Sequence, residues 1–441
     1  MTAALLFGSF ILLVFLRVNI AASLAVASII VMFVANGFDG FAAVTDIMYT
    51  SVAKFTLLAI PFFILAGVIM DHIGISQRLI DFAQSLVGHR KGGIVLVTVL
   101  VAIFFAAISG SGPATVAAIG GILIPAMMKN GYRKETAGGL VASAGAIGII
   151  IPPSIAFIIF AVVAGDQIPI TINRLFMAGI IPGIIVGLAL FIAGMYVRHR
   201  DIKKGIFNEE IEKQNVKATG KERWEAFLKA IPGLMMPVII LGGIYGGIFT
   251  PTESAVVAVV YGLLVGLFIH RKGYGKMLYK IFVDSALQTA VVMIIVSAAS
   301  VFAYIVTTEQ IAANVSEAVL GITDNKIMIL LLVNVILLIA GAFIDAISAF
   351  YIFVPILLPI MLALGVDPTV FGVFMTINLA IGLFTPPVGL NLYVAAGMSK
   401  TNILEISKGV LPFVVASIVV LLLVTYIPAL STFLPDLLNV K

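Results

Sequence analysis

Two short stretches of small and polar residues interrupt otherwise apolar sequence. They read SGSGPAT, from Ser109 to Thr115, and FIDAISA, from Phe343 to Ala349. Small residues let a backbone approach a ligand closely, and Asp345 is the one carboxylate in the otherwise uncharged run 327–366. Hard cations prefer oxygen ligands, so both stretches are candidates for binding a cation such as sodium. Asp345 would serve either as a cation ligand or as the cap of a following helix.

A proline pair follows each stretch, Pro152-Pro153 in the first case and Pro386-Pro387 in the second. Proline removes a backbone donor and clashes with the preceding turn, so each pair predicts a break in a long apolar helix. Non-helical backbone at membrane depth is tolerated only where protein buries it or where it lines a cavity. The two breaks therefore predict free carbonyls for sodium and helix ends for an anionic substrate.

The composition places these features in a membrane. Of 441 residues, 61% are hydrophobic and 11% charged, whereas soluble domains have roughly 45 to 50% and 25%. The chain has no cysteine, which excludes disulfides and thiolate metal sites. In a membrane protein the net charge of +5 does not indicate nucleic-acid binding. The positions of the basic residues instead indicate which loops face the cytoplasm. The first apolar stretch lacks a basic leader and a cleavage site, so we expect a mature span.

The two halves of the chain repeat each other. A shift of 234 residues places Ala146-Ile147-Gly148 on Ala380-Ile381-Gly382, one proline pair on the other, and Pro125 on Pro359. A shared AIG-x-x-x-PP at a fixed distance from an upstream proline indicates an internal repeat.

Basic residues indicate that the repeat is inverted. Segments 72–93 and 129–134 hold three Lys or Arg each, but the positions 234 further on hold only Lys326. The bias reverses in the 36–54 loop, where Lys54 stands alone, while the counterpart has Arg271, Lys272, Lys276 and Lys280. Because basic loops remain in the cytoplasm, equivalent loops must face opposite sides.

Inversion requires an odd number of crossings in each half, and the segment lengths allow five. Segments 94–108 and 114–128 are shorter than the about 20 residues that span a bilayer. We interpret them as a re-entrant hairpin that enters and leaves on one side. Both termini then lie outside and the 198–231 linker inside, so that 22 of the 26 basic residues are cytoplasmic. The outer four are Lys54, Arg174, Lys326 and Lys441.

The sequence thus predicts an all-α polytopic membrane protein made of two inverted-topology repeats, each with a re-entrant helical hairpin and a discontinuous transmembrane helix. The expected organisation is a first repeat over 1–207, with hairpin 1 at about 94–130 and a broken helix at 136–165; a cytoplasmic amphipathic linker helix over 208–231; and a second repeat over 232–441, with hairpin 2 at about 327–364 and a broken helix at 369–397.

Paired broken helices in inverted halves are typical of a secondary-transporter site near the midplane. Ser154 and Thr385 adjoin the breaks and are expected to line this site. Asn378 and Asn391 flank the second proline pair, where helix-to-helix hydrogen bonding and ligand binding are both open interpretations. The stretch from Thr250 to Glu253 predicts a capping box at the start of a helix.

Enzyme functions lack support in the sequence. There is no G-x-x-x-x-G-K-[ST] for ATP and no H-E-x-x-H for a metalloprotease, and Ser111 does not complete G-x-S-x-G. The four histidines, His72, His89, His199 and His270, stand beside charged residues and are interpreted as solvated loop side chains. A channel or structural scaffold has no need of two matched broken helices.

The runs SGSGPATVAAIGGILIPAMMKNGYRKETAGGLVASAGAIGIIIPPS, GAFIDAISAFYIFVPILLPIMLALGVDP and INLAIGLFTPPVGLNLYVAA resemble the large membrane subunit of tripartite ATP-independent periplasmic (TRAP) transporters. The resemblance covers essentially the whole chain. It implies an elevator-type fold of the ion-transporter superfamily in a bacterial inner membrane, importing an organic acid, of the sialic acid or C4-dicarboxylate class. It implies sodium as the coupling ion and no cofactor. It also implies two protein partners within the lipid-bound assembly, a small four-helix membrane subunit and a soluble periplasmic substrate-binding protein.

The resemblance also implies site residues. The first sodium site would use Ser109, Gly110, Ser111, Gly148, Ile151 and Pro152, and the second Phe343, Asp345, Ala346, Gly382, Thr385 and Pro386. Substrate would lie near Ser109, Ser154 and Ser348, with Asn378 as a further candidate.

Neither tip has the Ser-Asn-Thr triplet of related stand-alone dicarboxylate carriers, so a substrate pose cannot be transferred from them. The small SGSG tip favours a bulky ligand such as sialic acid. The alternative function is a stand-alone divalent-anion/sodium symporter that needs no binding protein.

Overall fold

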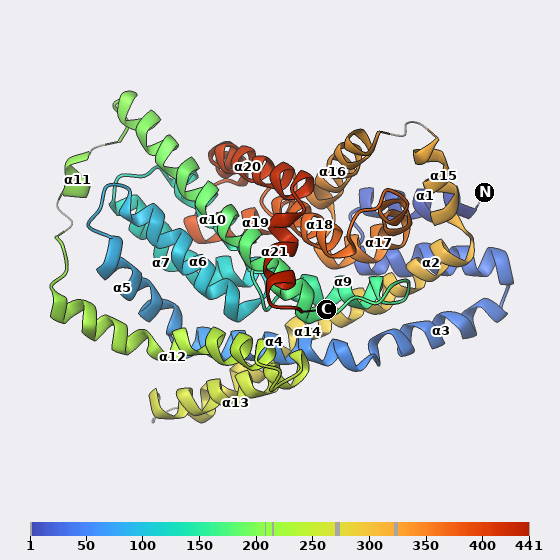
Figure 1. Cartoon of the computed structure of the whole chain (residues 1–441), viewed down its shortest axis with the longest axis horizontal. Helices are drawn as coiled ribbons and strands as arrows, with labels where there is room; N and C mark the ends of the chain where they lie inside the picture. The colour runs from blue at the N-terminus through green and yellow to red at the C-terminus, as the bar shows by residue number, and fades with distance from the viewer. Residues whose placement is uncertain (1, 208, 214–215, 270–273, 322–324, 441) are drawn as a thin grey trace.

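The computed structural model describes residues 2–207, 209–213, 216–269, 274–321 and 325–440 (Figure 1). Four basic or boundary positions used in the sequence predictions fall outside these ranges. They are residue 208, at the start of the predicted linker, Arg271 and Lys272 of the predicted cytoplasmic loop, and Lys441. His270 also lies outside the described residues.

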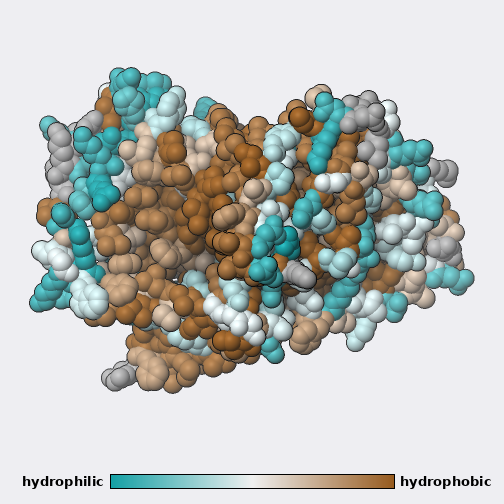
Figure 2. Space-filling model, in the orientation of Figure 1, coloured by the Kyte–Doolittle hydropathy of each residue, from teal (hydrophilic) through white to brown (hydrophobic). Residues whose placement is uncertain are grey.

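Within the described ranges every regular element is helical, and nine helices are long and apolar enough to cross a membrane. In Figure 2 apolar surface covers the middle of the visible face, whereas polar side chains gather where α10 and α11 meet. Apolar side chains outside the core suit a lipid environment, in which only helices and closed barrels satisfy the backbone. The predicted fold class, an all-α membrane protein with two repeats, is confirmed.

Each half contains a helical hairpin. The first joins α6 (Gly93–Ser109) to α7 (Gly112–Lys129), and the second joins α16 (Lys326–Phe343) to α17 (Ala346–Ala363). The bounds of α7 and α17 differ by 234 residues at both ends, which is the shift found in the sequence. The two hairpins approach the middle of the molecule from opposite ends of its long axis (Figure 1).

Each half also contains a broken helix, and both breaks fall at the proline pairs. In the first half α8 (Lys134–Ala146) leads through a 3-10 turn, η2 (Ile147–Ile149), to α9 (Ile155–Ala164). In the second half α18 (Pro368–Gly382) is followed by α19 (Leu390–Ser399). The Pro152-Pro153 and Pro386-Pro387 peptide bonds are cis.

The remaining helices complete the repeat. In the first half they are α1 (Thr2–Phe15), α2 (Ile20–Asn36), α3 (Asp39–Val52), η1 (Phe55–Leu58), α4 (Ala59–His72), α5 (Ile75–Val87) and α10 (Ile172–Lys203). Between and after come α11 (Glu209–Lys213), α12 (Gly220–Tyr245), α13 (Pro251–Ile269), α14 (Tyr274–Thr308), α15 (Ile311–Leu320), α20 (Ile403–Tyr426) and α21 (Ala429–Leu437).

Prolines explain where the halves differ. The stretch expected as a loop at 36–54 is largely the helix α3, and η1 separates it from α4. The corresponding segment of the second half is one uninterrupted helix, α14. Pro61 stands in the first turn of α4 and matches Ile295 within α14, so a continuous helix is possible only in the second half.

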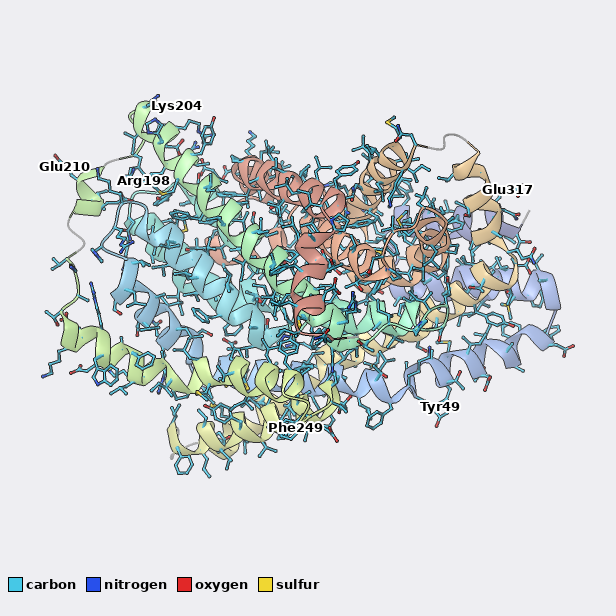
Figure 3. The ribbon with its side chains drawn as sticks, viewed as in Figure 1. Tyr49, Arg198, Lys204, Glu210, Phe249 and Glu317 are labelled. Carbon is cyan, nitrogen blue, oxygen red and sulfur yellow. The ribbon has the colours of Figure 1, made fainter. Side chains whose placement is uncertain are left out.

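The linker between the repeats also differs from the expected single helix over 208–231. A capping box formed by Thr219 and Glu222 starts α12, which then continues to Tyr245 without a boundary at residue 231. Before it, the short α11 lies beside the end of α10, where Figure 3 shows Arg198 and Lys204. Arg198 Nε donates to Glu212 Oε2 at 2.9 Å, and the Gly92 amide donates to Glu212 Oε1 at 3.2 Å. The linker is thereby joined to the entrance of hairpin 1.

The helices pack as two groups. In the group that we call the frame, α4 packs on α13 and α14, and α14 also packs on α2 and α3. In the group that we call the hairpin group, α8 packs on α7 and α20, α16 on α18, and α9 on α17. The groups meet where α14 contacts α17 and where α4 contacts α6 and α9.

Candidate functional site

The tip of hairpin 1 lies directly against the first helix break. The turn residues Ser109, Gly110 and Ser111 join α6 to α7, with Gly110 in the left-handed region at φ 60°. The Gly110 carbonyl accepts a hydrogen bond from the Ile155 amide, the first residue of α9, at 3.3 Å. A Cβ atom on Gly110 would lie 2.8 Å from the Pro153 carbonyl oxygen, so the close approach requires glycine.

Hydroxyl groups organise this tip. The Thr115 hydroxyl donates to the Ser111 carbonyl at 2.8 Å and lies 2.8 Å from the Ser109 hydroxyl. The Ser109 hydroxyl lies 3.3 Å from the same Ser111 carbonyl, so either hydroxyl can be the donor between the two side chains. Both hydroxyl oxygens keep lone pairs. Thr115, which the sequence predictions missed, lies among the predicted residues of tip 1.

Gly148 brings the break against the same oxygens. A Cβ atom on Gly148 would lie 2.7 Å from both the Ser111 carbonyl oxygen and the Thr115 hydroxyl oxygen. Four of the six residues predicted for the first sodium site, Ser109, Gly110, Ser111 and Gly148, are therefore brought together. Ile151 and Pro152 lie buried in the break itself, and it is the neighbouring Pro153 whose carbonyl faces the tip.

The tip of hairpin 2 carries a carboxylate instead. Asp345 caps α17, since its Oδ1 accepts from the Ser348 amide at 3.0 Å and its Oδ2 from the Ser348 hydroxyl at 2.6 Å. The shift of 234 residues places Asp345 on Ser111. The capping role that the sequence allowed is therefore present, and each carboxylate oxygen keeps a lone pair for a further ligand.

The second tip also lies against the second break. Gly382 fits so closely against the backbone of Gly341 that a side chain would overlap it. A cavity of about 50 Å³ adjoins this contact, lined by Phe343, Asp345 and residues of the break. Ala346 begins α17, and the Thr385 hydroxyl donates to the Ile381 carbonyl at 2.6 Å. Pro386 follows Thr385 within the break.

A larger cavity of about 550 Å³, which we call the Ser109 cavity, separates tip 1 from the frame. Ser109, Ser111 and Ile155 line it on one side, and α4 and α14 on the other. The frame contributes Asp71, His72 and Asp284, and His72 Nε2 lies 3.3 Å from Asp284 Oδ2. His72 was expected in a loop, but it ends α4, and its Nδ1 lies 3.0 Å from the Val68 carbonyl oxygen, to which a protonated Nδ1 donates.

The predicted substrate residues divide into two sets. Ser109 lines the Ser109 cavity, whereas Ser154, Ser348 and Asn378 are fully buried. Ser154 caps α9, accepting from the Phe157 amide at 3.4 Å and donating to the Ile149 carbonyl at 2.6 Å. Asn378 donates to Asn334 Oδ1 at 2.7 Å, which is the helix-to-helix hydrogen bonding that the sequence left open.

A second cavity of about 440 Å³, which we call the Lys54 cavity, lies at the other end of α9. Ile155 lines the Ser109 cavity, while Val162 and Val163 line the Lys54 cavity. The two are counterparts in the repeat, because each of three position pairs related by 234 residues has one member in each cavity: Lys54 and Gln288, Thr50 and Asp284, Ala117 and Tyr351. The symmetry between the two cavities is incomplete. Tip 1 lines the Ser109 cavity, whereas no described residue of tip 2, from Phe343 to Ser348, lines the Lys54 cavity.

Comparison with known proteins places this arrangement in a family. Residues 7–430 match the family described as "Tripartite ATP-independent periplasmic transporter, DctM component". An isethionate TRAP transporter permease of Oleidesulfovibrio alaskensis is 46% identical over 97% of this chain, which spans 65% of that relative's length. A C4-dicarboxylate TRAP large permease of Rhodobacter capsulatus is 37% identical over the whole of both chains.

A sialic acid TRAP permease of Haemophilus influenzae is 34% identical over 97% of this chain and 67% of its own length. Among solved structures, the YdaH transporter of Alcanivorax borkumensis has a TM-score of 0.59 over 88% of both chains, at 14% identity. At this identity the likeness concerns the fold alone.

Proposed function

This chain belongs to the DctM component family of tripartite ATP-independent periplasmic transporters, and from that premise we propose that it imports an organic acid anion across the bacterial inner membrane together with sodium. It is a transporter subunit and not an enzyme. The observation that carries the sodium proposal is that each hairpin tip lies beside a helix break, through the close approach of Gly110 to Pro153 in the first half and through a shared cavity next to the Gly341–Gly382 contact in the second.

Oxygen atoms at these contacts suit a hard cation. At tip 1 the Ser109 and Thr115 hydroxyls and the Ser111 carbonyl gather beside Gly148. At tip 2 the Asp345 carboxylate lies beside residues of the second break. Broken helices supply further unpaired carbonyls, which coordinate sodium in transporters of this architecture. We propose one sodium ion at each tip.

The substrate is proposed as an organic acid in contact with tip 1. The relatives are named for isethionate, C4-dicarboxylates and sialic acid, so the class is broader than the two acids expected from the sequence. A cavity of about 550 Å³ lined by Ser109 and Ser111 accommodates any of the three. Isethionate is the first substrate to test, because the relative named for it is 46% identical.

Sidedness follows from the basic residues. Hairpin 1 begins after Arg90 and Lys91 and ends at Lys129, so it enters from the cytoplasm. The Ser109 cavity then opens toward the cytoplasm and the Lys54 cavity toward the periplasm. Tip 1 lines the Ser109 cavity, on the cytoplasmic side, whereas tip 2 does not line the Lys54 cavity, on the periplasmic side. We therefore propose that the structure represents an inward-facing state of an elevator motion. Both termini would be periplasmic.

Partners are proposed from the family, whose description as tripartite requires two further components. One is a small four-helix membrane subunit and the other a soluble periplasmic protein that delivers substrate to the outer face. Membrane lipid would cover the remaining apolar surface. A stand-alone symporter, the alternative, would transport without either component.

Reconstituted uptake tests the proposal. Proteoliposomes with both membrane subunits should accumulate isethionate, succinate or sialic acid only with an inward sodium gradient and with the cognate binding protein. Ser109→Ala and Thr385→Ala should each weaken the dependence on sodium. Uptake without the binding protein would support the stand-alone symporter, and unchanged sodium dependence in both variants would overturn the site assignment.

A further inference from the structure

The Lys54 cavity has the chemistry of an anion site. It lies between the frame helices α3 and α14 and the hairpin-group helices α9 and α17. Lys54 is the one basic side chain among its described lining residues. We propose that this cavity is a first binding station for the substrate, in which its acid group replaces Asp166 at Lys54. This inference rests on the proposed function for the anionic substrate and for the periplasmic side.

Lys54 is available to an incoming anion. Its ammonium group contacts both carboxylate oxygens of Asp166, at 2.9 and 3.0 Å. The two side chains are 39% and 69% exposed, and exposed ion pairs contribute little to stability because water screens them. A substrate acid group can therefore replace the Asp166 carboxylate at small cost, while the Lys54 charge stays paired.

The rest of the lining favours a hydroxylated acid. Five lining hydroxyls, those of Thr50, Ser51, Ser300, Thr307 and Thr308, donate their protons to carbonyls of their own helices. Their oxygens are left as acceptors. Hydroxyl groups on the substrate can donate to these oxygens, and its acid group finds its one charged donor in the Lys54 ammonium, beside the neutral donors Gln167, Tyr304 and Tyr351. The lining therefore fits an organic acid that carries hydroxyl groups.

The position of the ion pair couples binding to movement. Lys54 precedes η1 and α4 in the frame, and Asp166 follows α9 in the hairpin group. An anion that replaces Asp166 therefore removes a link between the two groups. The counterpart of Lys54 in the Ser109 cavity is the neutral Gln288, so this cationic link is present on one side only.

A cysteine-protection experiment tests the station without requiring transport. The chain has no cysteine, so Thr307→Cys places a single thiol in the cavity. In nanodiscs, its modification by a small neutral methanethiosulfonate is followed against increasing isethionate, succinate or sialic acid. We expect at least one of the three to slow the modification saturably. Thr45→Cys is the matched control, an exposed threonine with the same bond to its own helix that lies outside the cavity.

Charge variants in the Thr307→Cys background distinguish a binding site for the acid group from an ion pair that only links the frame to the hairpin group. Lys54→Met should raise the half-protecting concentration about tenfold, as loss of a charge-assisted hydrogen bond does, and Lys54→Arg should restore it. Asp166→Asn should lower it, because the competitor is removed. Lys326→Met, a lysine outside the cavity, should leave it unchanged.

Two results would overturn the inference. One is the absence of protection by all three acids. The other is a change of the half-protecting concentration in the same direction for Lys54→Met and Asp166→Asn. Both variants break the ion pair, so they would have equal effects if the pair only held the two helix groups together and did not bind substrate. The uptake assay separates this failure from failure of the proposed function: sodium-driven uptake without protection rejects only the station, whereas protection without uptake rejects only the proposed function.

Discussion

At the scale of single residues, Thr115 connects the parts of tip 1. Its hydroxyl lies between the Ser109 hydroxyl and the Ser111 carbonyl, and its oxygen faces Gly148. We predict that Thr115→Val raises the half-saturating sodium concentration by about tenfold, the effect typical of groups that orient metal ligands. Uptake measured against sodium concentration checks this value.

Thr98→Val is the matched control for this prediction. Thr98 is also buried in hairpin 1, and its hydroxyl donates to the Ile94 carbonyl at 2.8 Å. Loss of that bond should affect stability in the same way as Thr115→Val, without an effect on sodium. Equal sodium dependence in the two variants would contradict a role for Thr115 at the site.

Asp345 has two roles that substitution can separate. Asparagine caps helices as well as aspartate does, so Asp345→Asn should keep thermal stability within about 0.5 kcal/mol of the parent. Because it lacks the negative charge, we expect its half-saturating sodium concentration to rise at least about tenfold. Asp345→Ala should lose sodium affinity and in addition about 1 kcal/mol of stability. An Asp345→Asn variant with parental sodium dependence would show that Asp345 is a cap alone.

At the scale of elements, the tip-to-break contact depends on glycine. A methyl group on Gly148 would press on the Ser111 carbonyl and the Thr115 hydroxyl. We therefore predict that Gly148→Ala weakens sodium activation of uptake and costs about 1 to 3 kcal/mol, as overpacking does. Gly121→Ala on α7 is the control, because nothing lies within 4 Å of its Cβ position. It should be neutral or stabilising through helix propensity.

The elements show what sequence can predict. The proline pairs determine the helix breaks locally, so the breaks were predictable from the sequence. Length is a weaker basis for the hairpin, because α7 has 18 residues and is among the nine helices long and apolar enough to cross a membrane. Helix α3 was expected as a loop, because its sequence lacks a long apolar run and the signal of an amphipathic helix is weaker. The division at Pro61 becomes clear only when α4 is compared with the matching part of α14.

The site was predictable only where it is local. Tip 1 and Gly148 lie within one short stretch of chain, and their contact follows from the hairpin geometry. The frame side of the Ser109 cavity combines His72 with Asp284, which are remote in sequence and meet only through packing of α4 on α14. No spacing rule connects such residues. The one feature of the sequence that could have indicated Asp284 is its position as a carboxylate within the long apolar helix α14.

At the scale of the whole molecule, the unequal cavities predict a movement. Tip 1 lines the Ser109 cavity, whereas no described residue between Phe343 and Ser348 lines its counterpart, the Lys54 cavity. If the halves exchange these environments during transport, α7 must move relative to α14. Spin labels at Ala117→Cys and Gln288→Cys, on opposite walls of the Ser109 cavity, should then report two distances that differ by more than about 5.4 Å, one helical turn.

Double electron–electron resonance measures these populations with and without sodium and substrate. A pair within the frame, Gln288→Cys with Leu58→Cys, is the control and should keep one distance, because Leu58 immediately precedes α4, which packs directly on α14. Ligands shift only an equilibrium in which they bind the states unequally, so sodium with substrate should change the ratio of the two populations of the first pair. A single distance under every condition would reject the exchange of environments, and parallel changes in both pairs would indicate distortion of the frame instead of movement against it.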